Sequence, residues 1–153
     1  TLPMTARPPH TVRKSVLVPY SAERMFALVE RVEDYPKFLP WCGGTEVKRH
    51  EDGTVTATVR IDFRGIRQGF TTHNTPEPGR RITMALRDGP FSHLHGEWRF
   101  SPLREDACKV EFELEYRFAG GLLGRVLEPV FDHIARSFVD AFVRRAEHLH
   151  ALG

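Results

Sequence analysis

Three histidines, His73, His93 and His95, come nearest in the sequence to the spacing of a metal site. His93 and His95 are two residues apart, so on a strand their side chains share a face. Alternation puts His95 on a polar face with Glu97 and Arg99, and a simple meander separates His73 from the pair by one strand. We therefore interpret them as surface histidines and predict no metal site.

Catalytic motifs are weak. No serine lies in a G-x-S-x-G elbow. The glycine-rich residues 120–124 lack both the G-x-G-x-x-G pattern and the Lys-Ser/Thr of a phosphate-binding loop, so we interpret them as a hinge between strand and helix. No acid–base pair stands out, and we predict no catalytic residues and no metabolic cofactor.

Aromatic and amide side chains carry the stronger signal. Core packing is the simpler interpretation of any one aromatic residue, but together they suit a pocket for a ligand with a polar head and an apolar body. Gln68, Thr72 and Asn74 share the strand parity of Phe70 and would hydrogen-bond a ligand carbonyl or a buried water. The predicted ligand-binding residues are Tyr35, Phe38, Trp41, Phe63, Phe70, Asn74, Met84, Trp98, Phe112, Val126, Val130 and Ile134.

Alternating strands must position these side chains. In residues 108–118 the apolar residues from Cys108 to Phe118 face one way and the charged residues face the other. Turn signals such as Arg64-Gly65 separate further alternating segments, at residues 55–63, 81–87 and 94–100. This pattern predicts an antiparallel sheet with one apolar face.

Helices are predicted before and after the sheet. Ser21 is a good N-cap for a helix over residues 21–31, and a second short piece is expected from Pro36 to Pro40. After residue 121 we expect a helix of about 28 residues, roughly 42 Å long, with a kink or break at Pro129. Its predicted apolar stripe comprises Leu123, Leu127, Val130, Ile134, Phe138 and Ala141. Gly69 and Gly96 are expected to let the sheet bend and to leave room beneath this helix.

Composition limits the function classes. The chain has 153 residues and a formal net charge of +2, which suits one domain and argues against a DNA-binding protein. The arginines of the polar sheet face could contact RNA phosphates, but intervening carboxylates favour cross-strand ion pairs instead. Cys42 and Cys108 are interpreted as buried free thiols.

No apolar run approaches the roughly 20 residues of a membrane span. We expect a disordered leader at residues 1–10, a single domain at residues 11–150, and a soluble cytoplasmic protein that extends at most to peripheral contact with the inner membrane.

Four segments resemble one known family: residues 16–22 (VLVPYSA), 35–42 (YPKFLPWC), 70–74 (FTTHN) and 96–100 (GEWRF). Together they are similar to the coenzyme-Q-binding and ribosome-association-toxin family of the START-like, polyketide-cyclase superfamily. The resemblance spans about residues 11–149, and the Tyr-Pro-x-Phe-Leu-Pro-Trp-Cys run is its most specific part. It implies an α+β helix-grip fold, in which a curved antiparallel sheet wraps around a long C-terminal helix and encloses a hydrophobic cavity.

The resemblance implies several functions. Mitochondrial members bind ubiquinone and support respiration, some bacterial members are described as toxins that bind the large ribosomal subunit, and older names refer to polyketide cyclases or lipid transport. Residues 1–10 lack the Arg-rich character of a mitochondrial presequence, which favours a bacterial protein. We expect a non-enzymatic carrier of a polyprenyl quinone or similar lipid, which visits the membrane surface to load. The alternatives are a ribosome-binding toxin of a toxin–antitoxin system that blocks subunit joining and, third, a polyketide cyclase.

Overall fold

The computed structural model describes residues 9–152 and has the α+β architecture that the sequence predicts. Its elements in chain order are β1 (His10–Val18), α1 (Ala22–Glu30), the 3₁₀ helix η1 (Val32–Lys37), β2 (Cys42–Arg49), β3 (Val55–Phe63), β4 (Ile66–Glu77), β5 (Arg81–Asp88), β6 (Phe91–Arg104), β7 (Ala107–Phe118) and α2 (Leu122–Leu152).

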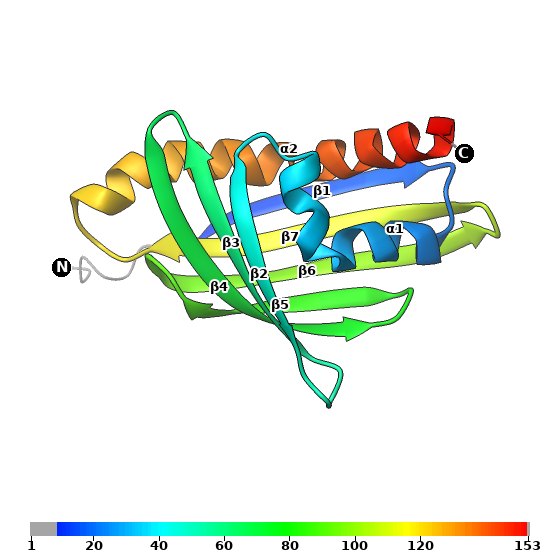
Figure 1. The fold of residues 1–153 in the computed structure, drawn as a ribbon, viewed down its shortest axis with the longest axis horizontal. Coiled ribbons are helices and arrows are strands. Elements are labelled where there is room, and N and C mark those ends of the chain that lie inside the picture. The colour runs from blue at the N-terminus through cyan, green and yellow to red at the C-terminus, as the bar shows by residue number, and fades with distance from the viewer. Residues whose placement is uncertain (1–8, 153) are drawn as a thin grey trace.

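The strands form one antiparallel sheet in the order β1-β7-β6-β5-β4-β3-β2. The sheet curves, so that β2, β3 and β4 cross over the long helix α2 while β1 and β7 run beside it (Figure 1). The helices α1 and η1 cover the part of the concave face that α2 leaves open. The predicted helix-grip fold is confirmed.

The first strand begins earlier than the sequence analysis placed it. His10, assigned there to a disordered leader, pairs with Tyr116 of β7 and stacks on its ring at 5.3 Å between centroids. The strand therefore starts where β7 offers a pairing partner. The rest of the predicted leader lies outside the described residues, apart from Pro9.

Local signals set the ends of α1 correctly. The Ser21 hydroxyl accepts a hydrogen bond from the backbone N–H of Arg24 at 3.1 Å, as an N-cap does. The helical piece expected from Pro36 instead begins at Val32 and ends at Lys37, because backbone bonds between residues three apart tighten the chain directly after α1.

The long helix continues through Pro129 without a break, since Pro129 is exposed and water can satisfy the carbonyl that loses its partner. The buried face of α2 also differs from the predicted apolar stripe, because Leu123 is exposed and the sheet covers a wider arc of the helix than one stripe. The buried hydrophobic residues of α2 are Leu127, Phe131, Ile134, Ala135, Val139, Phe142 and Ala146.

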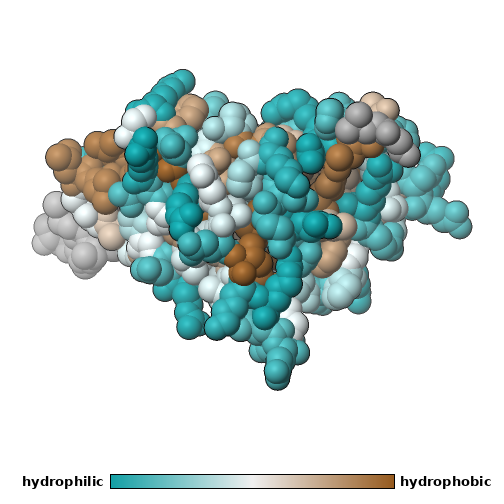
Figure 2. All heavy atoms as spheres, viewed as in Figure 1, coloured by the Kyte–Doolittle hydropathy of each residue, from teal (hydrophilic) through white to brown (hydrophobic). Residues whose placement is uncertain are grey.

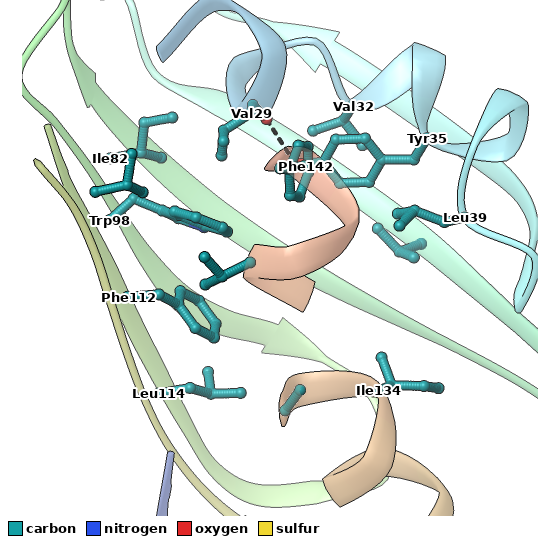
Figure 3. Packing of buried hydrophobic residues seen from close by; sticks show 14 of the residues in the cluster. Val29, Val32, Tyr35, Leu39, Ile82, Trp98, Phe112, Leu114, Ile134 and Phe142 are labelled. Atoms are coloured by element: carbon teal, nitrogen blue, oxygen red, sulfur yellow. Dashed lines mark hydrogen bonds between the residues drawn. The ribbon is translucent and has the colours of Figure 1, made fainter. Parts of the chain in front are cut away.

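An aromatic cluster fills the core where α1, η1 and α2 meet the sheet. The Trp98 ring lies 4.6 Å from the Phe112 ring and 5.3 Å from the Phe142 ring, between centroids. Tyr35 of η1 meets Phe142 from the other side at 5.3 Å (Figure 3). This cluster fixes the height at which α2 lies over the sheet.

A candidate ligand-binding cavity

A cavity of about 70 Å³ lies between α2 and the concave face of the sheet. Because strand side chains alternate, Ala57 and Val59 of β3 point into it, as do Phe70, Thr72 and Asn74 of β4. The lining is almost wholly apolar and comprises Val32, Tyr35, Trp41, Ala57, Val59, Phe70, Thr72, Asn74, Met84, Leu94, Phe112, Leu114, Phe131, Ile134, Ala135 and Phe138.

One hydrogen-bonded pair breaks the apolar lining. The Thr72 hydroxyl donates to Oδ1 of Asn74 at 2.7 Å, and the two residues are only 6% and 8% exposed. No hydrogen bond from the Asn74 amide nitrogen is present within residues 9–152, and this nitrogen is not one of the fully buried atoms that lack a partner. An unused donor on the wall of an apolar cavity favours a ligand that presents an oxygen acceptor.

Tyr35 contributes its ring rather than its hydroxyl. The hydroxyl donates to the backbone carbonyl of Val29, so it is already engaged (Figure 3). Burial, and after it the nearby Glu30 carboxylate, raises the pKa of Tyr35 above its usual range. The Tyr35 hydroxyl proton is therefore used within the protein.

Gly96 was expected to leave room beneath α2, but neighbouring side chains fill that room. It lies opposite Met84 on β5 and Leu114 on β7. A Cβ at this position would lie 2.7 Å from Cε of Met84 and 3.1 Å from Cδ1 of Leu114. These two side chains therefore occupy the room that a larger residue at position 96 would take.

Two smaller hollows adjoin the cavity. One extends past Asn74 and Met84 to Glu30 at the end of α1. The other shares Phe70 and Phe131 with the cavity and continues beneath the N-terminal part of α2. Because they share lining residues, the cavity and the second hollow form one apolar seam under α2, and the first hollow continues from the cavity toward α1.

An ion-pair clasp lies at the outer edge of the α1-side hollow. One nitrogen of the Arg49 guanidinium contacts Glu30, and the other contacts both carboxylate oxygens of Glu33 at 2.8 and 3.0 Å. The clasp joins the end of β2 to α1 and η1.

Residues 18–143 match the family model described as polyketide cyclase/dehydrase and lipid transport. The chain belongs to this family. It is 40% identical over 139 residues to the ribosome association toxin RatA of Pseudomonas aeruginosa, covering 91% of this chain and 96% of that protein. It is 27% identical over 141 residues to the mitochondrial coenzyme Q-binding protein COQ10 homolog B of Xenopus laevis, covering 90% of this chain and 58% of that protein.

A solved structure shows the same family fold. The Zhui aromatase/cyclase from Streptomyces sp. R1128 superposes with a TM-score of 0.78 at 19% identity, covering 90% of this chain and 93% of that one. The comparisons confirm the family resemblance that the sequence segments carry.

In this member of the polyketide cyclase/dehydrase family, many of the predicted ligand-binding residues line the cavity or its extension. Those on the cavity wall are Tyr35, Trp41, Phe70, Asn74, Met84, Phe112 and Ile134. Val130 lies on the wall of the hollow beneath the start of α2.

Four predicted residues lie elsewhere. Trp98 is 1% exposed in the aromatic core, and Phe38 packs on Tyr35 and Phe142. Phe63 stacks against His133 at the outer side of α2. Val126 is half exposed to solvent. Strand parity placed Phe63 and Trp98 on the apolar face, but it does not reveal which part of that face meets the cavity.

Sequence reasoning missed Phe131, Leu94 and Leu114 as lining residues. Phe131 is adjacent to the predicted Val130, and the one-residue difference reflects the wider buried arc of α2. Leu94 and Leu114 were visible as inward residues by parity, and their nearness to Gly96 was the available signal.

Other predicted groups lie outside the cavity. The Nε2 atom of His93 is 3.5 Å from the Glu115 carboxylate, and the His73 ring faces His50 at 6.2 Å. Residues 9–152 hold no cluster of three or more potential metal ligands. The polar sheet face carries the predicted cross-strand ion pairs, such as Arg81 with Glu97 at 3.1 Å.

Both cysteines are buried free thiols, as predicted, and burial raises the pKa of each. In the part of the chain that the structure describes, no helix is long and apolar enough to cross a membrane.

Proposed function

We propose that this protein binds a lipophilic small molecule in the cavity beneath α2 and holds a carbonyl oxygen of that ligand at Asn74. The observation that carries the proposal is the Asn74 side chain in an otherwise apolar cavity wall. Its oxygen accepts a hydrogen bond from Thr72, and its N–H groups remain for a ligand oxygen. A polyprenyl quinone fits this chemistry, because its ring carbonyls accept hydrogen bonds and its tail is apolar. The name of the COQ10 relative, a coenzyme Q-binding protein, supports this ligand class.

Ligand binding requires the cavity to widen. A volume of about 70 Å³ is below the roughly 150 Å³ at which an engineered protein cavity holds benzene. Met84 is the best candidate to move, because its unbranched side chain changes rotamer easily. Phe70 and Phe138 are only partly buried and can also yield. The seam that continues beneath α2 is the natural direction for an isoprenoid tail.

The test measures binding of a short-tailed ubiquinone analogue by the quenching of tryptophan fluorescence, to which the cavity-lining Trp41 contributes. Replacing Asn74 with Leu should weaken binding about tenfold, since it removes one hydrogen bond worth about 1.4 kcal/mol. Thr71→Val is the matched control, because the Thr71 hydroxyl pairs with Thr58 on the other face of the same strands at 2.7 Å. Equal affinity of Asn74→Leu and wild type would refute the assignment of Asn74.

The scarcity of titratable side chains among the residues that line the cavity favours a carrier over a cyclase. Among the described residues that line the cavity, Tyr35 has the one side chain that titrates as an acid or base. Its hydroxyl is bonded to the Val29 carbonyl and its pKa is raised by burial, so it is a poor proton donor or acceptor near neutral pH. Mass spectrometry of a solvent extract from natively purified protein would identify a retained ligand as intact lipid rather than a cyclised product.

A second candidate is association with the large ribosomal subunit. It is favoured by relatives at 40% and 42% identity, each covered over 96% of its length, that are named ribosome association toxins. This role predicts co-sedimentation with large subunits, and binding that weakens steeply as salt rises, because phosphate contacts release counterions. Absence of co-sedimentation at low salt would remove this candidate.

A further inference from the structure

The first turn of α2 exposes a cluster of aliphatic side chains. Leu122, Leu123 and Val126 are 77%, 49% and 48% exposed, and we refer to them as the apolar tip. They appear as a hydrophobic area at the end of the molecule where α2 begins (Figure 2). The other exposed large hydrophobic residues among those described, Leu17 and Leu103, stand next to the last residues of β1 and β6. Those strands end at the opposite end of the sheet (Figure 1). Three of these five residues therefore lie within five positions of one another at the start of α2.

The backbone holds the apolar tip away from the sheet. Gly121 has φ of +106°, a left-handed conformation that favours glycine, and a Cβ there would meet nothing within 4 Å. Gly124, on the other side of the turn, packs so closely that its Cβ would lie 2.8 Å from the carbonyl oxygen of Ala119. Close packing on the Gly124 side directs the two leucines into solvent.

The apolar tip adjoins the ligand seam. The hollow beneath the start of α2 is lined by Phe118, Leu127 and Val130, which are neighbours in sequence of the tip and its hinge. That hollow shares Phe70 and Phe131 with the main cavity. A ligand leaving an apolar environment at the tip would thus meet apolar side chains along its way to Asn74.

Positive charge accompanies the apolar tip. Arg125 lies on the same turn and is exposed. The Arg64 guanidinium lies 4.8 Å from the centre of the Phe63 ring, which stacks on His133 of α2. His133 follows Val126 by two turns, about 10 Å along the helix.

Acidic groups of this part of α2 are engaged at the sheet. Glu128 contacts His10 at 2.6 Å, and Asp132 accepts a hydrogen bond from the buried Tyr116. Both carboxylates keep part of their surface exposed, but each has a partner, whereas Arg125 has no ion pair with another described residue. Exposed aliphatic side chains beside an exposed arginine suit the surface of an anionic membrane.

We propose that the apolar tip docks on a lipid bilayer that contains anionic phospholipid, and that this end of the molecule is where ligand passes between bilayer and cavity. A second copy of the chain is a poorer occupant, because three aliphatic side chains fall far short of the roughly 20–30 residues per side in a stable protein interface. The inference rests on the proposed function, since only a lipophilic ligand requires loading from a bilayer.

The experiment is co-sedimentation of the ligand-free protein with vesicles of phosphatidylcholine, with and without phosphatidylglycerol. Wild type should bind the anionic vesicles more tightly. Leu122→Ser/Leu123→Ser should weaken that binding at least about tenfold, because aliphatic carbons leave the bilayer. The matched control is Leu17→Ser/Leu103→Ser, which removes exposed leucines elsewhere and should bind as wild type does. Arg125→Gln should reduce binding to the anionic vesicles only.

Several results would overturn the proposal: no binding of wild type to either vesicle, equal loss in the control variant, or a tip-dependent dimer that vesicles do not dissociate. The single variant Leu122→Ser tests the same point at the most exposed position if the double variant unfolds. Binding of a water-soluble quinone without vesicles separates the two proposals. The tip variants should keep that binding, whereas Asn74→Leu should lose it and still bind vesicles.

Discussion

The Thr72 hydroxyl and the Asn74 side-chain oxygen are joined by a 2.7 Å hydrogen bond on the wall of an otherwise apolar cavity, and this bond does not use the amide hydrogens of Asn74. The two residues are separated by one position on β4, so strand alternation places both on the concave face. Their partnership orients the amide before any ligand arrives.

Thr72 and Asn74 should contribute to the free energy of unfolding as a coupled pair. Thr72→Val and Asn74→Leu should each lower the free energy of unfolding by about 1 kcal/mol, because each leaves a buried polar partner unsatisfied. The double variant should be at least as stable as either single variant, since replacing both partners with apolar groups removes the unsatisfied group. Urea unfolding measures the cycle. Purely additive losses would contradict the coupling, and the outer-face pair Thr58 and Thr71 provides the comparison.

Gly96→Ala should reduce the capacity of the cavity. The added methyl would displace the end of Met84 and press on Leu114, at a cost of about 1–3 kcal/mol in stability. Quinone affinity should fall, and shortening Met84 in the same chain should restore part of it. Gly69→Ala is the control, because its nearest neighbours are 3.8 Å away. Unchanged affinity in Gly96→Ala would show that the ligand does not use this wall.

Stability should fall in alkaline solution. Burial, with smaller contributions from Glu30 and Asp132 respectively, raises the pKa of Tyr35 and of Tyr116 in the folded state. The unfolded tyrosines ionise near pH 10, so above that pH the unfolded state loses protons that the folded state keeps, and the free energy of unfolding decreases.

The decrease is at most about 1.4 kcal/mol per pH unit for each tyrosine, and the buried thiols Cys42 and Cys108 add to it from a slightly lower pH. Urea unfolding at several pH values on either side of pH 10 measures the slope. Tyr35→Phe should make the slope shallower, and an identical slope in that variant would argue against a protonated buried Tyr35.

Alanine variants of Trp98 and Phe70 should affect stability and ligand binding to different extents. Trp98→Ala should cost about 3–5 kcal/mol, because it empties the centre of the aromatic core. Phe70→Ala should cost less, since Phe70 is only partly buried, yet it should weaken ligand retention because it lines the cavity. The neighbouring Arg99→Ala should change neither by much, as its ion pairs are exposed. Thermal unfolding and quinone binding on the same samples test this order.

Local physical chemistry made much of the fold predictable. Strict alternation in residues 108–118, the N-cap at Ser21 and the Arg64-Gly65 turn each depend on neighbouring residues, and all three are present. Parity also places Thr72 and Asn74 on the apolar face. These features follow from backbone geometry within a few residues, so the sequence alone determines them.

Only the tertiary structure decided which part of the apolar face is cavity and which is core. Trp98 and Phe112 share parity and sit opposite one another, yet Phe112 lines the cavity and Trp98 does not. Likewise Val126 and Val130 fit the same helical spacing, but one is exposed on the apolar tip and the other faces the seam. The outcome depends on where α2 crosses the curved sheet and on how closely α1 and η1 approach it. Those are distances between segments far apart in the chain, and no local periodicity encodes them.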